Sequence, residues 1–203
     1  MYKTFKQEHE KQEVLLKIAT LFEMQEKEVE AEKTYLKCTK FNNVEAFLKL
    51  GSLLIKNGRV SSGVENLEKA NCLKRDNLEI QNKLVYGYSL NEDTMEKALN
   101  LAHTILKKEP ESLETLIMTA NILEKQGKVR EAIEIVTALD SVKQAEYIKH
   151  YLGLLHLSNS NFTEAFNHFK AALALQPDHV PSLIEVATII SDISPKQSIS
   201  LLK

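Results

Sequence analysis

The sequence predicts an all-α fold in which pairs of helices stack into a solenoid. One spacing recurs: a small residue is followed by a second after twelve residues, by a bulky apolar residue four further on, and by another core residue after three more. Four copies begin at Ala19, Gly51, Ala120 and Gly153. A unit of about 34 residues cannot bury its apolar face alone, so repetition at this period indicates that neighbouring units stack.

The small residues have a physical role in such a fold. Two antiparallel helices can approach closely only where a small side chain lies at the crossing, with large residues three and four positions away. We therefore expect Gly51 and Gly153 to lie at helix contacts. Gly58 and Gly127 follow the small residue of their units by seven positions, where the first helix must end. We expect both in the left-handed conformation that glycine adopts past a helix end.

The remaining positions resemble the tetratricopeptide repeat (TPR) family over nearly the whole chain. That motif also places large apolar residues four before, one before and three after the first small residue, and a proline late in the unit. Around Gly51 these positions hold Phe47, Leu50 and Leu54. Around Ala19 they hold Leu15, Ile18 and Phe22, and around Ala187 they hold Leu183, Val186 and Ile190. The resemblance implies a right-handed TPR solenoid.

Single units depart from the motif. The unit at Gly153 has polar Lys149 and His156 where aromatic residues are usual, and the unit at Ala120 has Thr119 where leucine is usual. These departures weaken individual units and leave the overall pattern intact.

We expect about five whole units and a truncated sixth in a single array over 12–203, after a charged lead-in at 1–11. The units span 12–43, 44–77, 78–112, 113–145, 146–179 and, in part, 180–203. The third unit fits only if its internal turn, Asn91 to Thr94, carries one extra residue. Asp93 to Glu96 and Asn161 to Glu164 have the spacing of a capping box and predict helix starts.

Composition narrows the classes of partner. The chain has 26 basic and 28 acidic residues and a net charge of -2, so it has no positive excess to neutralise phosphates. We do not expect nucleic acid as a partner, although RNA-binding pentatricopeptide repeats are the fold-level alternative. The sequence contains neither the apolar core of a signal peptide nor a membrane-spanning run, so we expect a cytoplasmic protein without membrane insertion.

The residues that carry chemistry are scattered. Two cysteines fit a reducing compartment, and we expect structural, buried roles for Cys38 and Cys72. His150 and His156 are six apart, too far round a helix to share a metal ion. No nucleophile lies beside a recognisable base, and no phosphate-binding loop is present. We therefore expect no enzymatic activity, cofactor or metal.

The TPR resemblance implies binding on the inner (concave) face, which the first helix of each unit lines. In the first three units this face carries Glu-to-Lys pairs, which are better explained as a solvated surface. Further along it becomes apolar and aromatic, which suits a partner helix or extended segment. The predicted partner-binding residues are Ile117, Met118, Asn121, Tyr147, His150, Tyr151, Leu154, Leu157 and Ile184. For Tyr147 and Tyr151, packing on neighbouring helices is an equal alternative.

One TPR function is not expected. Co-chaperones of this family hold the acidic tail of heat-shock chaperones in a carboxylate clamp of lysine, arginine and asparagine residues. Asn121 matches that clamp, but Ile117 replaces a lysine and Tyr151 an asparagine. Without a positive pocket a carboxylate has little to pair with.

The sequence therefore predicts an adaptor or scaffold that binds a protein segment on the inner face. The alternative is a structural subunit docked through the ends of its solenoid. The final half-unit is rich in apolar residues, so we expect that the chain continues in its natural form, docks another subunit at this end or self-associates there. These residues are Leu183, Val186, Ile190, Ile193, Ile199, Leu201 and Leu202.

Overall fold

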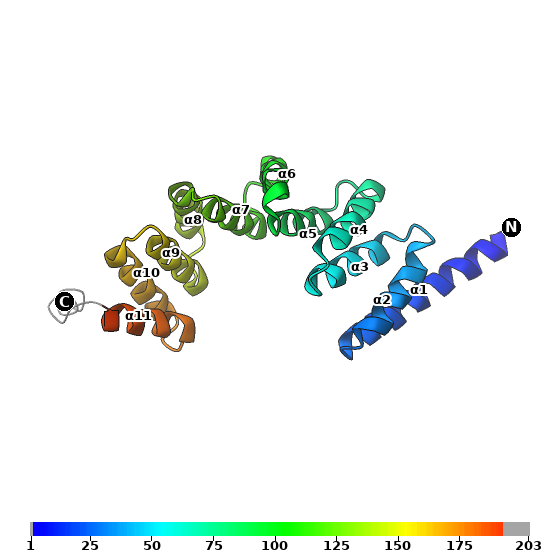
Figure 1. The fold of residues 1–203 in the computed structure, drawn as a ribbon, viewed down its shortest axis with the longest axis horizontal. Helices are drawn as coiled ribbons and strands as arrows, with labels where there is room; N and C mark the ends of the chain where they lie inside the picture. Colours follow the sequence, from blue (N-terminus) through cyan, green and yellow to red (C-terminus); the bar gives the residue numbers. More distant parts are fainter. Residues whose placement is uncertain (1, 193–203) are drawn as a thin grey trace. The chain divides into compact units, whose positions relative to one another are not determined.

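The computed structural model describes residues 2–192, and the side chains of residues 10–191 (Figure 1). Within that range the chain forms α-helices joined by short turns and no strand, which confirms the all-α prediction. The helices are α1 (Tyr2–Met24), α2 (Glu28–Thr39), α3 (Val44–Lys56), α4 (Val60–Leu73), α5 (Leu78–Ser89), α6 (Met95–Lys108), α7 (Leu113–Lys125), α8 (Val129–Val142), α9 (Glu146–Ser158), α10 (Phe162–Leu175) and α11 (Val180–Asp192). A short 3-10 helix, η1 (Glu92–Thr94), precedes α6.

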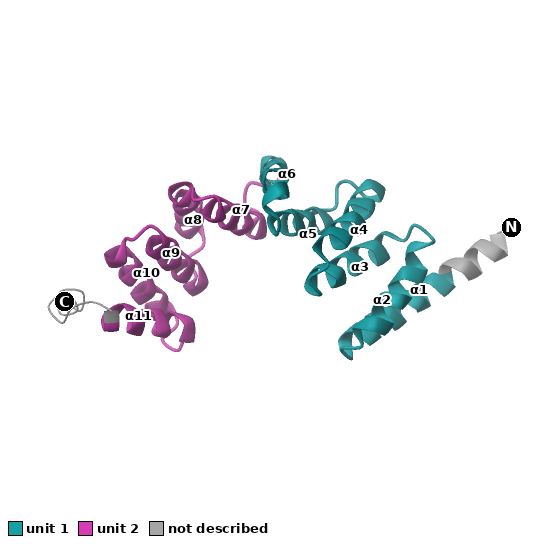
Figure 2. Cartoon of the chain, viewed as in Figure 1, with its two compact units in different colours: residues 1–108 teal, residues 109–203 magenta. Residues whose placement is uncertain are grey.

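The chain divides into two compact units, residues 1–108 and 109–203 (Figure 2). In unit 1, α1 packs on α2, α3 on α4 and α5 on α6, and in unit 2, α7 packs on α8 and α9 on α10. The first pair begins ten residues before the predicted first unit, at Tyr2, and a single array over 12–203 stays a prediction. Helix α1 begins at Tyr2, so most of the expected lead-in at 1–11 is helical.

Small residues occupy the helix crossings as predicted. A Cβ atom built on Gly51 would lie 2.9 Å from the carbonyl oxygen of Gly63, and one built on Gly63 would lie 2.7 Å from that of Gly51. The backbones of α3 and α4 therefore touch at this point. Gly87 of α5 makes a contact that we did not predict, since its Cβ would lie 2.8 Å from Cγ2 of Val64 in the preceding pair.

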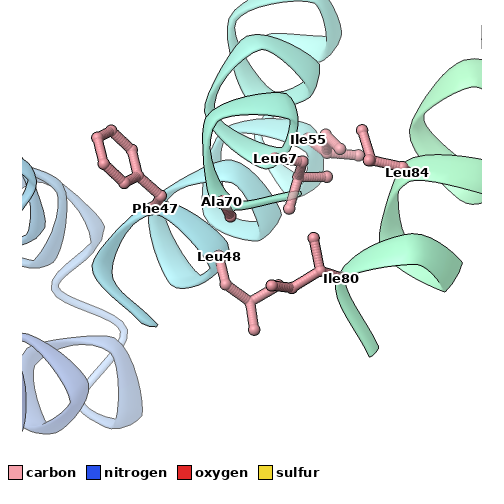
Figure 3. Packing of buried hydrophobic residues seen from close by; sticks show 7 residues of the cluster. All are labelled: Phe47, Leu48, Ile55, Leu67, Ala70, Ile80 and Leu84. Atoms are coloured by element: carbon pink, nitrogen blue, oxygen red, sulfur yellow. The ribbon is translucent and has the colours of Figure 1, made fainter. Parts of the chain in front are cut away.

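Within unit 1, two neighbouring helix pairs share a hydrophobic cluster. Figure 3 shows a cluster that draws side chains from three consecutive helices, α3, α4 and α5. Its buried members are Phe47, Leu48, Ile55, Leu67, Ala70, Ile80 and Leu84. Helix α4 therefore packs on α3 of its own pair and on α5 of the next pair.

The described turns after α1, α3, α7 and α9 are closed by a Schellman motif, whereas the turn after α5 contains η1. At the end of α3 the N–H of Gly58 donates to the carbonyl of Ile55 at 3.0 Å, and the N–H of Arg59 donates to that of Leu54 at 2.9 Å. Gly58 has a φ of 78° and Gly127, after α7, has 76°, which confirms the predicted left-handed glycines. The same turn after α9 uses Ser160, with a φ of 59°.

Placing glycine at one of these turns should stabilise the protein, and replacing glycine at another should destabilise it. A left-handed conformation costs an L-residue about 1–2 kcal/mol, so Ser160→Gly should raise the free energy of unfolding by about 0.5–1 kcal/mol after glycine's extra chain entropy is subtracted. Gly58→Ala should lower it by about 1 kcal/mol. Urea unfolding measures both changes. The control is Asn159→Gly, one residue earlier with a φ of -91°, which should not stabilise; a gain equal to that of Ser160→Gly would contradict the argument.

The predicted helix start at Asn161 is confirmed, since α10 begins at Phe162, but Asn161 makes no side-chain cap hydrogen bond. At the other predicted capping box, α6 begins at Met95 after η1, where Oδ1 of Asn91 accepts the N–H of Asp93 at 3.1 Å. Helix η1 occupies the turn in which we expected an extra residue. Side-chain caps are instead made by Asn43 on α3 and Asn77 on α5.

Candidate protein-binding site

In unit 2 the first helices of successive pairs lie side by side. The Tyr151 hydroxyl of α9 donates to Oδ1 of Asn121 in α7 at 2.5 Å, and the Ser158 hydroxyl of α9 donates to Glu124 in α7 at 2.7 Å. On the other side of α9, Nδ1 of His150 lies 3.0 Å from Oγ of Ser182 in α11. Helix α9 is therefore bonded to both α7 and α11, which brings the predicted inner-face residues onto three adjacent helices.

The predicted residues differ in accessibility. Asn121 is exposed, and Tyr147 and Ile184 keep 37% and 58% of their surface exposed. Ile117, Met118, His150, Tyr151, Leu154 and Leu157 are half-buried. Leu154 and Leu157 also pack against a core cluster built on Phe166 and Phe169 of α10, so they contribute to folding and expose only part of their side chains.

Tyr147 and Tyr151 also differ in accessibility. Tyr151 is half-buried with its hydroxyl on Asn121, and burial, together with nearby Glu124, raises the pKa of its phenol. It therefore packs between neighbouring helices. Tyr147 lies one turn earlier and is exposed, so its ring is the more available of the two.

The predicted inner face of unit 2 carries acidic as well as apolar residues. The repeat positions that line it also place Glu114 and Glu124 on α7 and Glu185 on α11. None of the corresponding positions on α7, α9 and α11 within the described residues holds lysine or arginine. A bound segment would meet apolar and aromatic surface beside negative charge.

A group that we did not predict joins α9 to α11. Ser182 is fully buried, and its hydroxyl oxygen lies 2.8 Å from Nδ1 of His179. The Ser182 N–H donates to the same Nδ1 at 3.3 Å. The Ser182 hydroxyl is thus within hydrogen-bond distance of both His179 and His150. The three side chains fix the start of α11 against α9.

Lowering the pH should reduce the free energy of unfolding through His150 and His168. Burial, and secondly the neighbouring His179, lowers the pKa of His150; burial, and secondly His156, lowers that of His168. The unfolded chain therefore binds more protons, so the free energy of unfolding should fall as pH drops below about 6.5, until the folded pKa values are passed. Urea titrations at pH 7.5 and 5.5 measure the loss. His150→Gln should reduce it and exposed His103→Gln should not; an unchanged loss in His150→Gln would contradict this.

Both polar departures from the TPR motif have partners in the structure. Nζ of Lys149 lies 2.6 Å from Oδ2 of Asp140 in α8, and the ring of His156 stacks on that of His168 in α10 at 5.1 Å. Oδ1 of Asp140 and Nδ1 of His156 are buried without a protein hydrogen-bond partner. The aromatic positions of the motif are thus replaced by a polar contact among α8, α9 and α10.

A hollow lies in unit 1, and none of the predicted site residues lines it. It is an open cavity of about 500 Å³ lined by Asn42, Phe47, Glu65, Glu68, Lys69, Cys72 and Leu73. Cys72 is exposed there, so the expectation that it is buried is wrong, while Cys38 is buried as predicted and its burial raises its pKa.

In the described part of the chain, His, Cys, Asp and Glu side chains form no cluster of three or more able to hold a metal ion. None of the helices described has the length and apolar character needed to cross a bilayer.

The stacked helix pairs are the fold of tetratricopeptide repeat proteins. A thermophilic TPR protein from Thermus thermophilus superimposes with a TM-score of 0.69 and 17% identity, over 89% of this chain and 99% of that one. A tetratricopeptide repeat protein from Parabacteroides merdae gives 0.75 and 18%, over 89% and 72%. YrrB, described as a TPR protein with an unusual peptide-binding site, gives 0.62 and 17%, over 83% and 88%. These similarities confirm the predicted fold.

Similarity in sequence is more limited. The chain is 32% identical over 94 residues to the N-terminal acetyltransferase A complex auxiliary subunit NAA15 of Arabidopsis thaliana, a match that covers 46% of this chain and 10% of that subunit. It therefore spans about a tenth of the length of this curated relative. No family model matches the sequence.

Proposed function

We propose that the protein is an adaptor or scaffold that binds a segment of another protein on the inner face of unit 2. The observation that carries this proposal is the bonding of α7, α9 and α11 side by side, with Asn121, Tyr147 and Ile184 exposed on these helices. Large aromatic and aliphatic side chains beside polar groups are typical of interface cores. The structural similarity to YrrB, whose description names a peptide-binding site, supports the same use of the fold.

The charge of this face selects the kind of segment. Glu114, Glu124 and Glu185 would repel an acidic peptide and attract a basic one. A helix or extended segment that carries both apolar and basic residues is complementary to the face. An acidic carboxyl-terminal tail is not, because no lysine or arginine occupies the inner-face positions of α7, α9 and α11 in the described residues.

Selection from a random peptide library displayed on phage tests this proposal. We expect the enriched peptides to combine basic with aromatic or aliphatic residues, and to bind the Tyr147→Ala, Ile184→Ala double variant at least tenfold more weakly. The control is Phe162→Ala, which truncates an exposed apolar residue of α10 and should leave binding unchanged. Acidic selected peptides, or equal binding to the double variant, would contradict the proposal.

A second function is favoured by apolar residues exposed on the first and last described helices. Leu21 and Met24 of α1 are 55% and 76% exposed, and Val180 and Leu183 of α11 are 61% and 45% exposed. These surfaces suit a structural subunit docked through α1 and α11, and the similarity to an auxiliary subunit of a complex supports that role. Such a subunit should co-purify with its neighbours in fixed stoichiometry, whereas an adaptor should be recovered with variable amounts of partner.

Self-association at the C-terminal end stays a prediction. Ile193, Ile199, Leu201 and Leu202 lie outside the described residues. Within them, Val186 and Ile190 pack against the core cluster of α10, and Ala187, expected at a helix crossing, is exposed. Sedimentation velocity on the isolated chain measures whether the protein associates.

A further inference from the structure

Helix α1 exposes a stripe of apolar side chains. Val14, Ile18 and Leu21 are 55%, 38% and 55% exposed, and Met24 is 76% exposed. Spacings of four and three residues place them on one side of the helix. We call these four residues the α1 stripe.

The equivalent positions are buried in other first helices of the repeats. Counted from the small residue of each unit, Val14, Ile18 and Leu21 lie five before, one before and two after it. In α3 those positions are Ala46, Leu50 and Leu53, and in α9 they are Ile148, Leu152 and Leu155; all six are at most 1% exposed. The covering element is the second helix of the preceding pair, since α2 packs on α3 and α8 on α9. The α1 stripe is thus an apolar surface of the type that such a helix covers.

The contact between α2 and α3 shows the chemistry of a covering helix. Ala31 and Tyr35 of α2, four residues apart, lie in one core cluster with Ala19 of α1 and with Leu50 and Leu53 of α3, and the Tyr35 hydroxyl also donates to Glu23 of α1 at 2.7 Å. Acidic residues of α2 pair with basic residues at and just after the end of α3. Glu28 lies 3.1 Å from Lys56, the last residue of α3, and Glu32 pairs with Arg59, which precedes α4. The start of the covering helix therefore lies at the end of the covered one, so the two helices run antiparallel.

One of the two basic positions recurs after α1. Lys27 lies eight residues after Ala19, as Arg59 lies eight after Gly51, and it is exposed three residues after Met24, which holds the position of Lys56. An acidic residue near the start of a covering helix would pair with it as Glu32 pairs with Arg59.

We propose that the α1 stripe binds an amphipathic helix of a partner protein. This helix runs antiparallel to α1, presents a small and an aromatic residue four positions apart to the stripe, and carries an acidic residue near Lys27. The inference rests on the second proposed function, docking as a structural subunit, and is independent of the inner face of unit 2. A second copy of the chain is the poorer occupant, because its α2, α4, α8 and α10 already cover the helices that follow them.

The probe for this surface is a lactam-bridged helical peptide with the sequence of residues 27–40, which contains α2, labelled with fluorescein. Fluorescence anisotropy should show saturable binding to the full chain and at least tenfold weaker binding to Leu21→Glu. The matched control is Val29→Glu, which places the same charge at an apolar α2 position that is 60% exposed, and binding should stay within twofold of wild type. Circular dichroism melting verifies that both variants are folded.

A charge exchange tests the orientation. Lys27→Glu should weaken binding about threefold, as expected for an exposed ion pair, and a peptide carrying Glu32→Lys should recover the loss. Failure of this recovery would overturn the antiparallel placement.

Two results would overturn the proposal itself. Equal binding to wild type and Leu21→Glu would mean that the peptide binds elsewhere or displaces the chain's own α2. A dimer in sedimentation velocity that Leu21→Glu dissociates would mean that a second copy occupies the stripe. The peptide could bind as expected while no other protein co-purifies in fixed stoichiometry. That combination would support the α1 stripe as a docking surface and contradict the proposed function as a structural subunit.

Discussion

Gly153→Leu is expected to lower the free energy of unfolding by about 1–3 kcal/mol through overpacking. A Cβ atom built on Gly153 would lie 2.4 Å from Cε1 of Phe169 and 2.7 Å from two further ring atoms. The ring cannot move away, because Phe169 is fully buried in a cluster with Phe166 and Ile189. The added side chain must therefore separate α9 from α10. Urea unfolding of wild type and variant measures the loss.

Shortening Phe169, the residue that Gly153 contacts, should recover part of the stability lost in Gly153→Leu. Phe169→Ala alone should cost about 3–5 kcal/mol, because it leaves a cavity. In the double variant Gly153→Leu, Phe169→Ala, leucine fills some of that cavity, so we expect a total loss at least about 1 kcal/mol smaller than the sum. Gly51→Leu combined with Phe169→Ala is the control and should be additive, since Gly51 contacts Leu67 and Gly63 instead. Additivity at Gly153 and Phe169 would contradict the packing argument.

Contacts within one helix pair were predictable from the sequence, and several contacts between pairs were not. The crossing of Gly51 and Gly63 follows from the small-residue spacing of a single unit. Gly87 is missed by that spacing because the atoms it approaches, on Val64 and Ile55, belong to the preceding pair. The left-handed conformation of Ser160 was not expected. The Schellman hydrogen bonds of this turn are made by backbone atoms, so a residue other than glycine can occupy the position if the fold offsets the backbone strain.

The candidate site shows the same limit. Repeat positions placed Asn121 and Tyr151 on the inner face, and the structure bonds them together. Burial depends on which helix covers a position, and a repeat pattern does not contain that information. Ile18 occupies a core position of the motif and is 38% exposed, for example. The contact of His179 with Ser182 and His150 could not be predicted either, because it forms only when α11 packs beside α9.

Breaking the ion pair between Lys149 and Asp140 should destabilise the protein more than removing both charges. The two side chains are 21% and 13% exposed, and Oδ1 of Asp140 is buried without another partner. Lys149→Leu leaves that carboxylate uncompensated. A fully buried pair broken in this way costs about 3–5 kcal/mol; partial exposure reduces the expected loss here to about 1–3 kcal/mol.

Replacing both residues removes the unpaired charge. The position of Lys149 is apolar in the TPR motif, so the double variant Lys149→Leu, Asp140→Leu should be more stable than Lys149→Leu alone and close to wild type. Urea unfolding of the two single variants and the double variant forms the cycle. The control is Lys108→Met, which breaks an exposed pair with Asp76 and should change nothing measurable. A double variant less stable than Lys149→Leu would show that the ion pair itself, and not relief of a buried charge, stabilises the contact between α8 and α9.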